Sequence, residues 1–333
     1  MTERTIPQTF LWRRLHSLFG LWLVLFLLEH LLTNSQAALL LGENGQGFVR
    51  MVNLIHDLPY LPAIEIFLLG TPIAFHAALG IKYALTAKSN ASKTDGSKPS
   101  LGQYGRNRAY SWQRITSWVL LFGIIGHVVK FRFIEYPVSV SYGKTKEYFV
   151  KVKVDPGLYS VASRLGVTLY DAASLQKEKQ MLASSSEQDL LQQYSTFSLY
   201  EGVPAEAYSY EKKEKMEALQ NHSLRRARTL ALTKKEVNSY EVIAATESFG
   251  TATLLSVRDT FKSPLYVILY TLFVLAASFH AFNGLWTFMI SWGLIFRQAA
   301  QKSMVRFCIA VMAVIAMLGL AAIWGTFWLN LRY

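Results

Sequence analysis

The stretch from residue 65 to residue 81 reads EIFLLGTPIAFHAALGI, and it decides the class of fold. After its first glutamate it has no charged side chain, and a single histidine, His76, lies in its second half. A helix needs about 20 mostly apolar residues to cross a bilayer. Five runs of the chain reach this length, over roughly residues 12–41, 62–87, 112–134, 264–296 and 303–330. They predict five transmembrane helices.

The charge of the chain is spread unevenly. Only 17% of the residues are charged and 52% are hydrophobic, whereas about 25% are charged in a typical soluble protein. Residues 131–262 hold 18 basic and 16 acidic side chains, but the rest of the chain holds 16 and 6. A basic excess in the more hydrophobic part is typical of short loops beside membrane spans. We therefore predict an all-α membrane protein and no nucleic-acid partner.

Residues 135–262 separate the third span from the fourth and differ from the rest in composition. We predict three regions: transmembrane helices one to three in 1–134, an insertion in 135–262, and transmembrane helices four and five in 263–333. The insertion is expected to form a small α+β or mixed domain outside the membrane. Its predicted elements are a hairpin over 138–154 around Gly143 and Lys144, helices over 172–195 and 205–236, and a strand over 242–255.

Basic residues on the short connections predict the orientation. The N-terminus and the second and fourth connections carry Arg4, Arg13, Arg14, Lys82, Lys88, Lys93, Lys98, Arg106, Arg108, Arg114, Arg297, Lys302 and Arg306. Cytoplasmic loops carry the excess of Lys and Arg. The N-terminus is therefore expected in the cytoplasm, and the insertion and the C-terminus on the outer, periplasmic side.

Five of the seven histidines lie in the predicted spans: His16, His30, His76, His127 and His280. Histidine at membrane depth is costly and usually faces the bundle interior with a partner. Any one of them could be a hydrogen-bonded packing residue. One histidine near the middle of each of four consecutive spans indicates bis-histidine ligation of b haem. The single cysteine, Cys308, excludes an iron–sulfur cluster built by this chain alone.

Depth in the membrane suggests how the histidines pair. His30 follows Arg14 by 16 residues, and His127 follows Arg114 by 13. At 1.5 Å per residue, both lie about 20–24 Å from the inner edge. This pairs His30 with His127 and leaves His76 and His280 for a second haem nearer the cytoplasm.

Glycines recur one turn from these histidines, at Gly80, Gly284 and Gly123. They could give a flat macrocycle access to the helix backbone, or they could serve ordinary helix packing. His16 and Arg14 lie near the inner surface and are candidates for a contact with a haem propionate or a quinone. They could equally be a positive interfacial anchor.

Two acids lie at or near the outer half of the membrane, Glu29 and Glu65. Quinol chemistry exchanges protons, and such acids could relay them. Solvation of the helix end explains Glu65 equally well.

Five stretches together resemble a known family. They are FLWRRLHSLFG (10–20), EHLLTN (29–34), EIFLLGTPIAFHAALGI (65–81), QRITSWVLLFGIIGH (113–127) and FHAFNGLWTFMISWG (279–293). In this order they resemble the single-polypeptide cytochrome b subunit of succinate dehydrogenase, the five-helix dihaem membrane anchor of bacterial complex II, which is related to fumarate reductases.

The resemblance implies a function, cofactors and partners. It implies a haem-binding bundle in the bacterial inner (cytoplasmic) membrane, with two b haems and with menaquinone or ubiquinone as substrate. His76 and His280 would ligate the haem nearer the iron–sulfur subunit, and His30 and His127 the distal haem. The flavoprotein subunit would hold FAD and the dicarboxylate site, so this chain would supply no catalytic residue of that site. The insertion over 135–262 departs from the family pattern, in which this connection is short.

Three other functions are compatible with the sequence. The chain could be the cytochrome b anchor of another quinone-linked dehydrogenase, including fumarate reductase. It could be a proton-coupled transporter that uses its membrane histidines as relays, although internal repeats are not evident. It could also be a structural anchor without haem.

Overall fold

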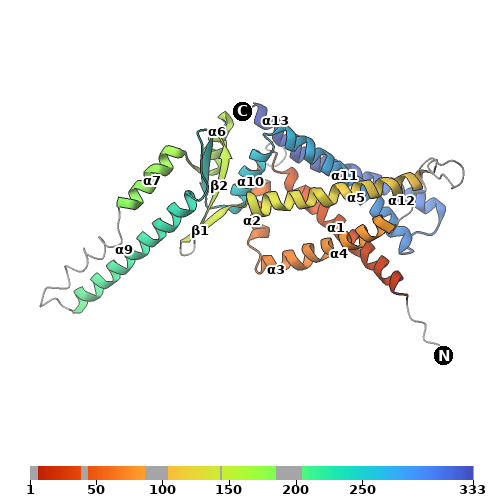
Figure 1. Ribbon diagram of the computed structural model, residues 1–333, viewed down its shortest axis with the longest axis horizontal. Coiled ribbons are helices and arrows are strands. Elements are labelled where there is room, and N and C mark those ends of the chain that lie inside the picture. Colours follow the sequence, from red (N-terminus) through yellow and green to blue (C-terminus); the bar gives the residue numbers. More distant parts are fainter. Residues whose placement is uncertain (1–6, 39–43, 87–103, 143–144, 185–204, 333) are drawn as a thin grey trace. The chain divides into compact units, whose positions relative to one another are not determined.

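The structure is a computed structural model that describes residues 7–38, 44–86, 104–142, 145–184 and 205–332 (Figure 1). The chain divides into two compact units, each considered by itself. The membrane unit comprises Met1–Ile134 and Thr260–Arg332, and the insertion unit comprises Glu135–Asp259. Of the basic residues used to predict orientation, Arg4, Lys88, Lys93 and Lys98 lie outside the described residues.

Within the described residues, five helices are long and apolar enough to cross a bilayer, so the chain is a multi-pass membrane protein. The five spans are Gln8–Ser35, Leu61–Thr86, Gly105–Ile134, Pro264–Ser291 and Gln298–Arg332. Their elements are α1 (Gln8–Ser35), α3 (Leu61–Glu65), η1 (Ile66–Gly70), α4 (Thr71–Thr86), α5 (Gly105–Val128), η2 (Val129–Ile134), α11 (Pro264–Ser291), α12 (Gln298–Leu320), η4 (Ala321–Gly325) and α13 (Thr326–Arg332). The predicted number and order of spans are confirmed. A further helix that was not predicted, α2 (Gln46–His56), precedes the second span.

The ends of the spans differ from the predicted ones where a local stop acts. Span four was predicted to reach residue 296, but α11 ends at Ser291 because Gly293 adopts a left-handed φ of 70°. The Leu294 amide then donates to the Met289 carbonyl (3.0 Å), and the Gly293 amide donates to the Ile290 carbonyl (3.1 Å). This is a Schellman termination, which glycine adopts without steric cost.

The membrane helices pack around α1 and α11. Helix α1 contacts α4, α11 and α12, and α5 packs on α11. A buried cluster of Val24, Leu31, Ala281 and Ile315 joins α1, α11 and α12. Many apolar side chains on the other helix faces are exposed, as lipid-facing residues are.

The insertion unit is built on a four-stranded antiparallel sheet in the order β1-β2-β4-β3. The strands are β1 (Val138–Tyr142), β2 (Thr145–Lys153), β3 (Thr168–Tyr170) and β4 (Glu241–Thr246), and the helices are α6 (Pro156–Leu165), α7 (Ala172–Ser184), α9 (Ala205–Leu232) and α10 (Phe249–Thr260). The predicted hairpin is present, with Val138 opposite Phe149 and Tyr142 opposite Thr145. Its expected turn residues, Gly143 and Lys144, lie outside the described residues, as do 185–195 of the first predicted helix.

Alternation along the strands gives the sheet two buried faces. Val150, Val152 and Ala244 lie in one hydrophobic cluster with side chains from α6 and α10. Phe149 and Ile243 lie in another, with side chains from α7 and α9. Neighbouring residues of a strand point to opposite faces, so one pair of central strands supplies both clusters.

One predicted element of the insertion is wrong. The sequence suggested a single strand over 242–255, but β4 ends at Thr246 and α10 begins at Phe249. Ser248 stops the strand because its hydroxyl accepts a hydrogen bond from the Thr251 amide (3.1 Å), as an N-cap does.

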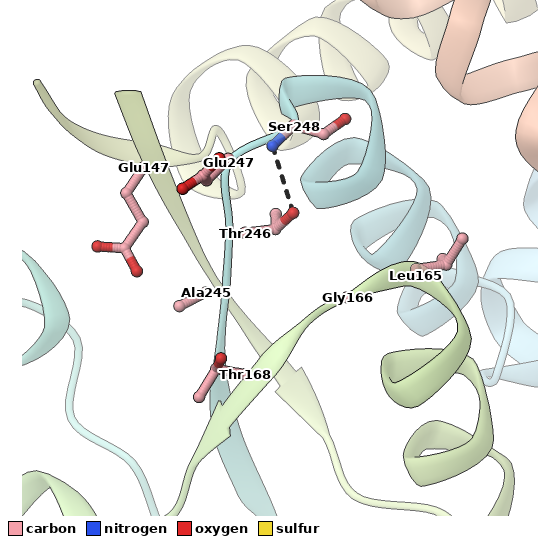
Figure 2. A pocket seen from close by; sticks show the side chains of 8 residues that line it. All are labelled: Glu147, Leu165, Gly166, Thr168, Ala245, Thr246, Glu247 and Ser248. Carbon is pink, nitrogen blue, oxygen red and sulfur yellow. Dashed lines mark hydrogen bonds between the residues drawn. The ribbon is translucent and has the colours of Figure 1, made fainter. Parts of the chain in front are cut away.

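A shallow hollow of about 430 Å³ lies on the insertion unit (Figure 2). Its lining includes Glu147, Thr168, Thr246, Glu247 and Ser248, and no histidine. Glu147 is already engaged, because its two carboxylate oxygens accept hydrogen bonds from the guanidinium of Arg228 (2.8 and 3.1 Å). These hydrogen bonds raise the pKa of Arg228 above its usual range. The polar groups predicted to bind a cofactor lie instead in the membrane unit.

Candidate functional site

The bundle brings four of the five span histidines together as two pairs. The imidazole centroids of His76 on α4 and His280 on α11 lie 6.2 Å apart, with the ring planes at 78°. Those of His30 on α1 and His127 on α5 lie 5.8 Å apart, with the planes at 86°. These are the same pairs that depth and the resemblance suggested.

Hydrogen bonds orient both rings of the His76–His280 pair. His76 Nδ1 lies 3.0 Å from the backbone carbonyl oxygen of His16, which can only accept, so Nδ1 carries the proton. His280 Nδ1 lies 3.4 Å from Thr116 Oγ1. The Thr116 hydroxyl donates its one proton within its own helix, to the Trp112 carbonyl (2.8 Å). Its oxygen therefore accepts from His280, and the Nε2 lone pair of each ring is left free.

Polar residues near His280 also hold α5 to α11. The amide of Gln113 donates to the His280 carbonyl (3.3 Å), and the buried Asn283 donates to Gln113 Oε1 (3.0 Å). This network fixes the helix segment that carries His280. It thereby limits where the imidazole can lie.

The His30–His127 pair has different partners. His127 Nδ1 lies 3.2 Å from the hydroxyl oxygen of Tyr270 on α11. Beside His30, the Asn34 amide donates to the His30 carbonyl (2.7 Å) and lies 3.5 Å from the ring Nε2, at the limit of a hydrogen bond. The strong bond of Asn34 goes to the backbone, so it leaves the His30 ring weakly held.

His16 lies against His76, whereas Arg14 contacts other residues. The rings of His16 and His76 are stacked, with centroids 4.1 Å apart and planes at 6°. His16 Nδ1 is buried and has no hydrogen-bond partner among the described residues. Arg14 instead donates to the Ser291 carbonyl and lies over the ring of Trp292 (5.3 Å to the centroid).

The two predicted acids lie apart and have different partners. Glu29 accepts a hydrogen bond from Thr33 Oγ1 (2.9 Å), one turn along α1. Glu65 forms an ion pair with Arg132 of η2 (2.8 Å). Both side chains of this pair are partly exposed.

The residues present fit a haem held by two imidazoles. If one metal ion bound a nitrogen of each imidazole at about 2 Å, the centroids of the two rings would lie about 6 Å apart. The separations in both pairs are close to this value. All four histidine residues are partly buried. Among the described residues, no three His, Cys, Asp or Glu side chains converge to hold a metal ion, and a bis-imidazole site needs only two donors.

Sequence reasoning missed the residues that contact the histidines from neighbouring helices. These are Gln113, Thr116 and Tyr270. Each is a polar residue within an apolar span, and that is the signal which could have selected them.

Comparison with known proteins gives one likeness to report. The chain is 36% identical over 124 residues to the succinate dehydrogenase cytochrome b558 subunit of Bacillus subtilis (strain 168). The match covers 36% of this chain and 54% of that protein, so the chain spans about half the length of the curated relative it matches. No family model matches the chain, and no solved structure does. The chain is thus a distant, partial relative of a succinate dehydrogenase cytochrome b subunit.

Proposed function

We propose that the chain is the cytochrome b membrane subunit of a succinate:quinone oxidoreductase. The observation that supports this most strongly is the presence of two histidine pairs, each from two different spans, at 5.8 and 6.2 Å. Two separate pairs provide ligands for two haems. A packing role for single histidines would not require this arrangement.

His76 and His280 would hold one b haem, and His30 and His127 the other. When bound, the haems supply one-electron transfer between the iron–sulfur subunit and a membrane quinone. The protein's own groups orient the ligands: the His16 carbonyl and the Thr116 hydroxyl each accept an imidazole proton. His16 Nδ1, buried without a partner among the described residues, is available to an oxygen of a propionate or a quinone.

The remaining assignments rest on the relation to the cytochrome b558 subunit. A flavoprotein and an iron–sulfur subunit would bind at the cytoplasmic face, where the basic connections lie. The N-terminus would be cytoplasmic and the C-terminus periplasmic. Arg14 would help to form that inner surface, and Glu29 and Glu65 would serve proton exchange with the quinone.

An absorption spectrum of the purified chain tests this function, with haem quantified per polypeptide. We expect two haems per chain with the bands of low-spin, bis-histidine b haem. A protein prepared with adequate haem supply that contains none would contradict the proposal and would favour the transporter. Whether the chain assembles with a succinate-oxidising dehydrogenase or with another dehydrogenase then distinguishes the two quinone-linked functions.

Gly20 gives a prediction about the space around His76. A Cβ added at Gly20 would lie 2.9 Å from His76 Cε1, and that ring is held in place by its stack on His16 and its hydrogen bond. Gly20→Ala is therefore expected to displace His76 and to weaken binding of the adjacent haem about tenfold. Haem titration of the apoprotein measures this.

Gly70→Ala, in the same span as His76, is the matched control. A Cβ at Gly70 would lie 3.8 Å from the Glu65 carbonyl oxygen, which is an ordinary contact, so haem affinity should be unchanged. Equal losses in the two variants would contradict the steric explanation.

A further inference from the structure

Tyr270 lies at the centre of the contacts around His127. Its ring contacts His127 (5.9 Å between centroids), Phe131 (6.4 Å), Phe261 (5.4 Å) and Phe273 (6.1 Å). Its hydroxyl oxygen lies 3.2 Å from His127 Nδ1. The aromatic contacts hold the ring, and the ring in turn fixes the position of the hydroxyl.

The hydrogen-bond partner of His127 differs chemically from the partners of His76 and His280. The carbonyl that contacts His76 can only accept, and the Thr116 hydroxyl beside His280 has its proton engaged within its own helix. A tyrosine hydroxyl can either donate or accept. If it donated to Nδ1, the proton of His127 would lie on Nε2 and that nitrogen could not bind iron. If it accepts, Nε2 is the free donor.

In the His30–His127 pair, the Tyr270 hydroxyl makes the shorter of the two side-chain contacts with an imidazole nitrogen, at 3.2 Å from His127 Nδ1. The contact of His30 Nε2 with Asn34 is at 3.5 Å, while the main hydrogen bond of Asn34 goes to a backbone carbonyl. The orientation and basicity of the ligands in this pair therefore depend chiefly on one side-chain hydroxyl. Such outer partners fix the tautomer and raise the basicity of a metal-bound imidazole.

We propose that Tyr270 is a positioning residue for His127, and that it accepts the Nδ1 proton and lowers the reduction potential of the haem held by His30 and His127. This rests on the proposed function. A more basic imidazole stabilises the oxidised iron more than the reduced iron, because it donates more electron density. Removing the acceptor raises the potential of that haem alone.

Tyr270→Phe tests this because it keeps the ring and its aromatic contacts and removes only the hydroxyl. Both haems of the purified variant are titrated potentiometrically, and His127→Ala identifies the bands of the haem concerned. We expect the potential of that haem to rise, its affinity for the protein to fall about tenfold, and the other haem to be unaffected. The spectrum of the other haem also reports that the bundle has folded. Complete loss of the His30–His127 haem with retention of the other would support the proposal too.

Tyr266→Phe is the matched control. Tyr266 lies one turn earlier on α11, and its ring contacts Lys130 Nζ (4.4 Å to the centroid). An unchanged potential in Tyr270→Phe, or the same rise in Tyr266→Phe, would overturn the role of Tyr270 while leaving the proposed function intact. Absence of haem from the unaltered chain would overturn both.

Discussion

His127→Ala is expected to remove one of two haems per chain and to leave the other in place. The variant deletes an imidazole that faces His30 at 5.8 Å, so the iron at that pair loses an axial ligand. The His76–His280 pair is formed by two other helices, α4 and α11, and keeps both of its ligands. The haem-to-protein ratio of the purified variant should therefore fall from two to one.

His76→Ala is the reciprocal test, and it should remove the other haem. His222→Ala, on α9 of the insertion unit, makes the same chemical change outside the membrane unit and should leave both haems. Retention of two haems in His127→Ala would show that the ligand assignment is wrong. Loss of both in either single variant would contradict the independence of the two pairs.

The spans could be predicted from the sequence because length and apolarity largely determine whether a segment crosses a bilayer. Their ends could be predicted less well. Gly293 stops α11 five residues before the apolar run ends, since the backbone turns left-handed there. Apolarity does not record such a turn, although a glycine followed by an apolar residue is compatible with one.

The histidine pairs could be anticipated, but the residues that orient them could not. The positions of His30 and His127 along their helices suggested that the two lie at a similar depth, and their ring centroids are 5.8 Å apart. Tyr266 and Tyr270 are four residues apart and lie on the same face of α11, so which of them reaches His127 depends on how far α11 is shifted along α5. The local sequence of either span does not record this shift.

The insertion unit shows the same limit in its ion pairs. The carboxylate of Asp155 accepts hydrogen bonds from both terminal nitrogens of Arg258 (2.5 and 2.6 Å), although the two residues are 103 positions apart. Asp155 also accepts from the Leu158 amide (3.1 Å) and so caps α6. The start of α6 could be inferred from the Asp-Pro pair, but the arginine could not be inferred from local sequence.

Arg258→Met is expected to destabilise the insertion unit by about 3 kcal/mol, because it leaves the Asp155 carboxylate without its charge partner in a mostly buried site. The side chains of this pair are only 10% and 16% exposed. An effect of this size makes the equilibrium constant for opening of the insertion unit roughly 100-fold larger. Hydrogen exchange of the β2 and β4 amides in the full-length protein measures it.

Two further variants test whether the loss of stability in Arg258→Met comes from leaving a buried carboxylate unpaired, or would follow from the loss of any ion pair. Lys151→Met is the milder comparison. Glu241 is as buried as Asp155, at 15% exposed, but its partner Lys151 is 35% exposed and 3.1 Å away, whereas Arg258 is 10% exposed and binds Asp155 through two nitrogens, so Lys151→Met should cost less than Arg258→Met. Adding Asp155→Asn to Arg258→Met removes the unpaired charge but keeps an oxygen that can cap α6, so it should restore much of the lost protection. Equal exchange in Arg258→Met and Lys151→Met would show that Arg258 does not stabilise this unit through a buried charge.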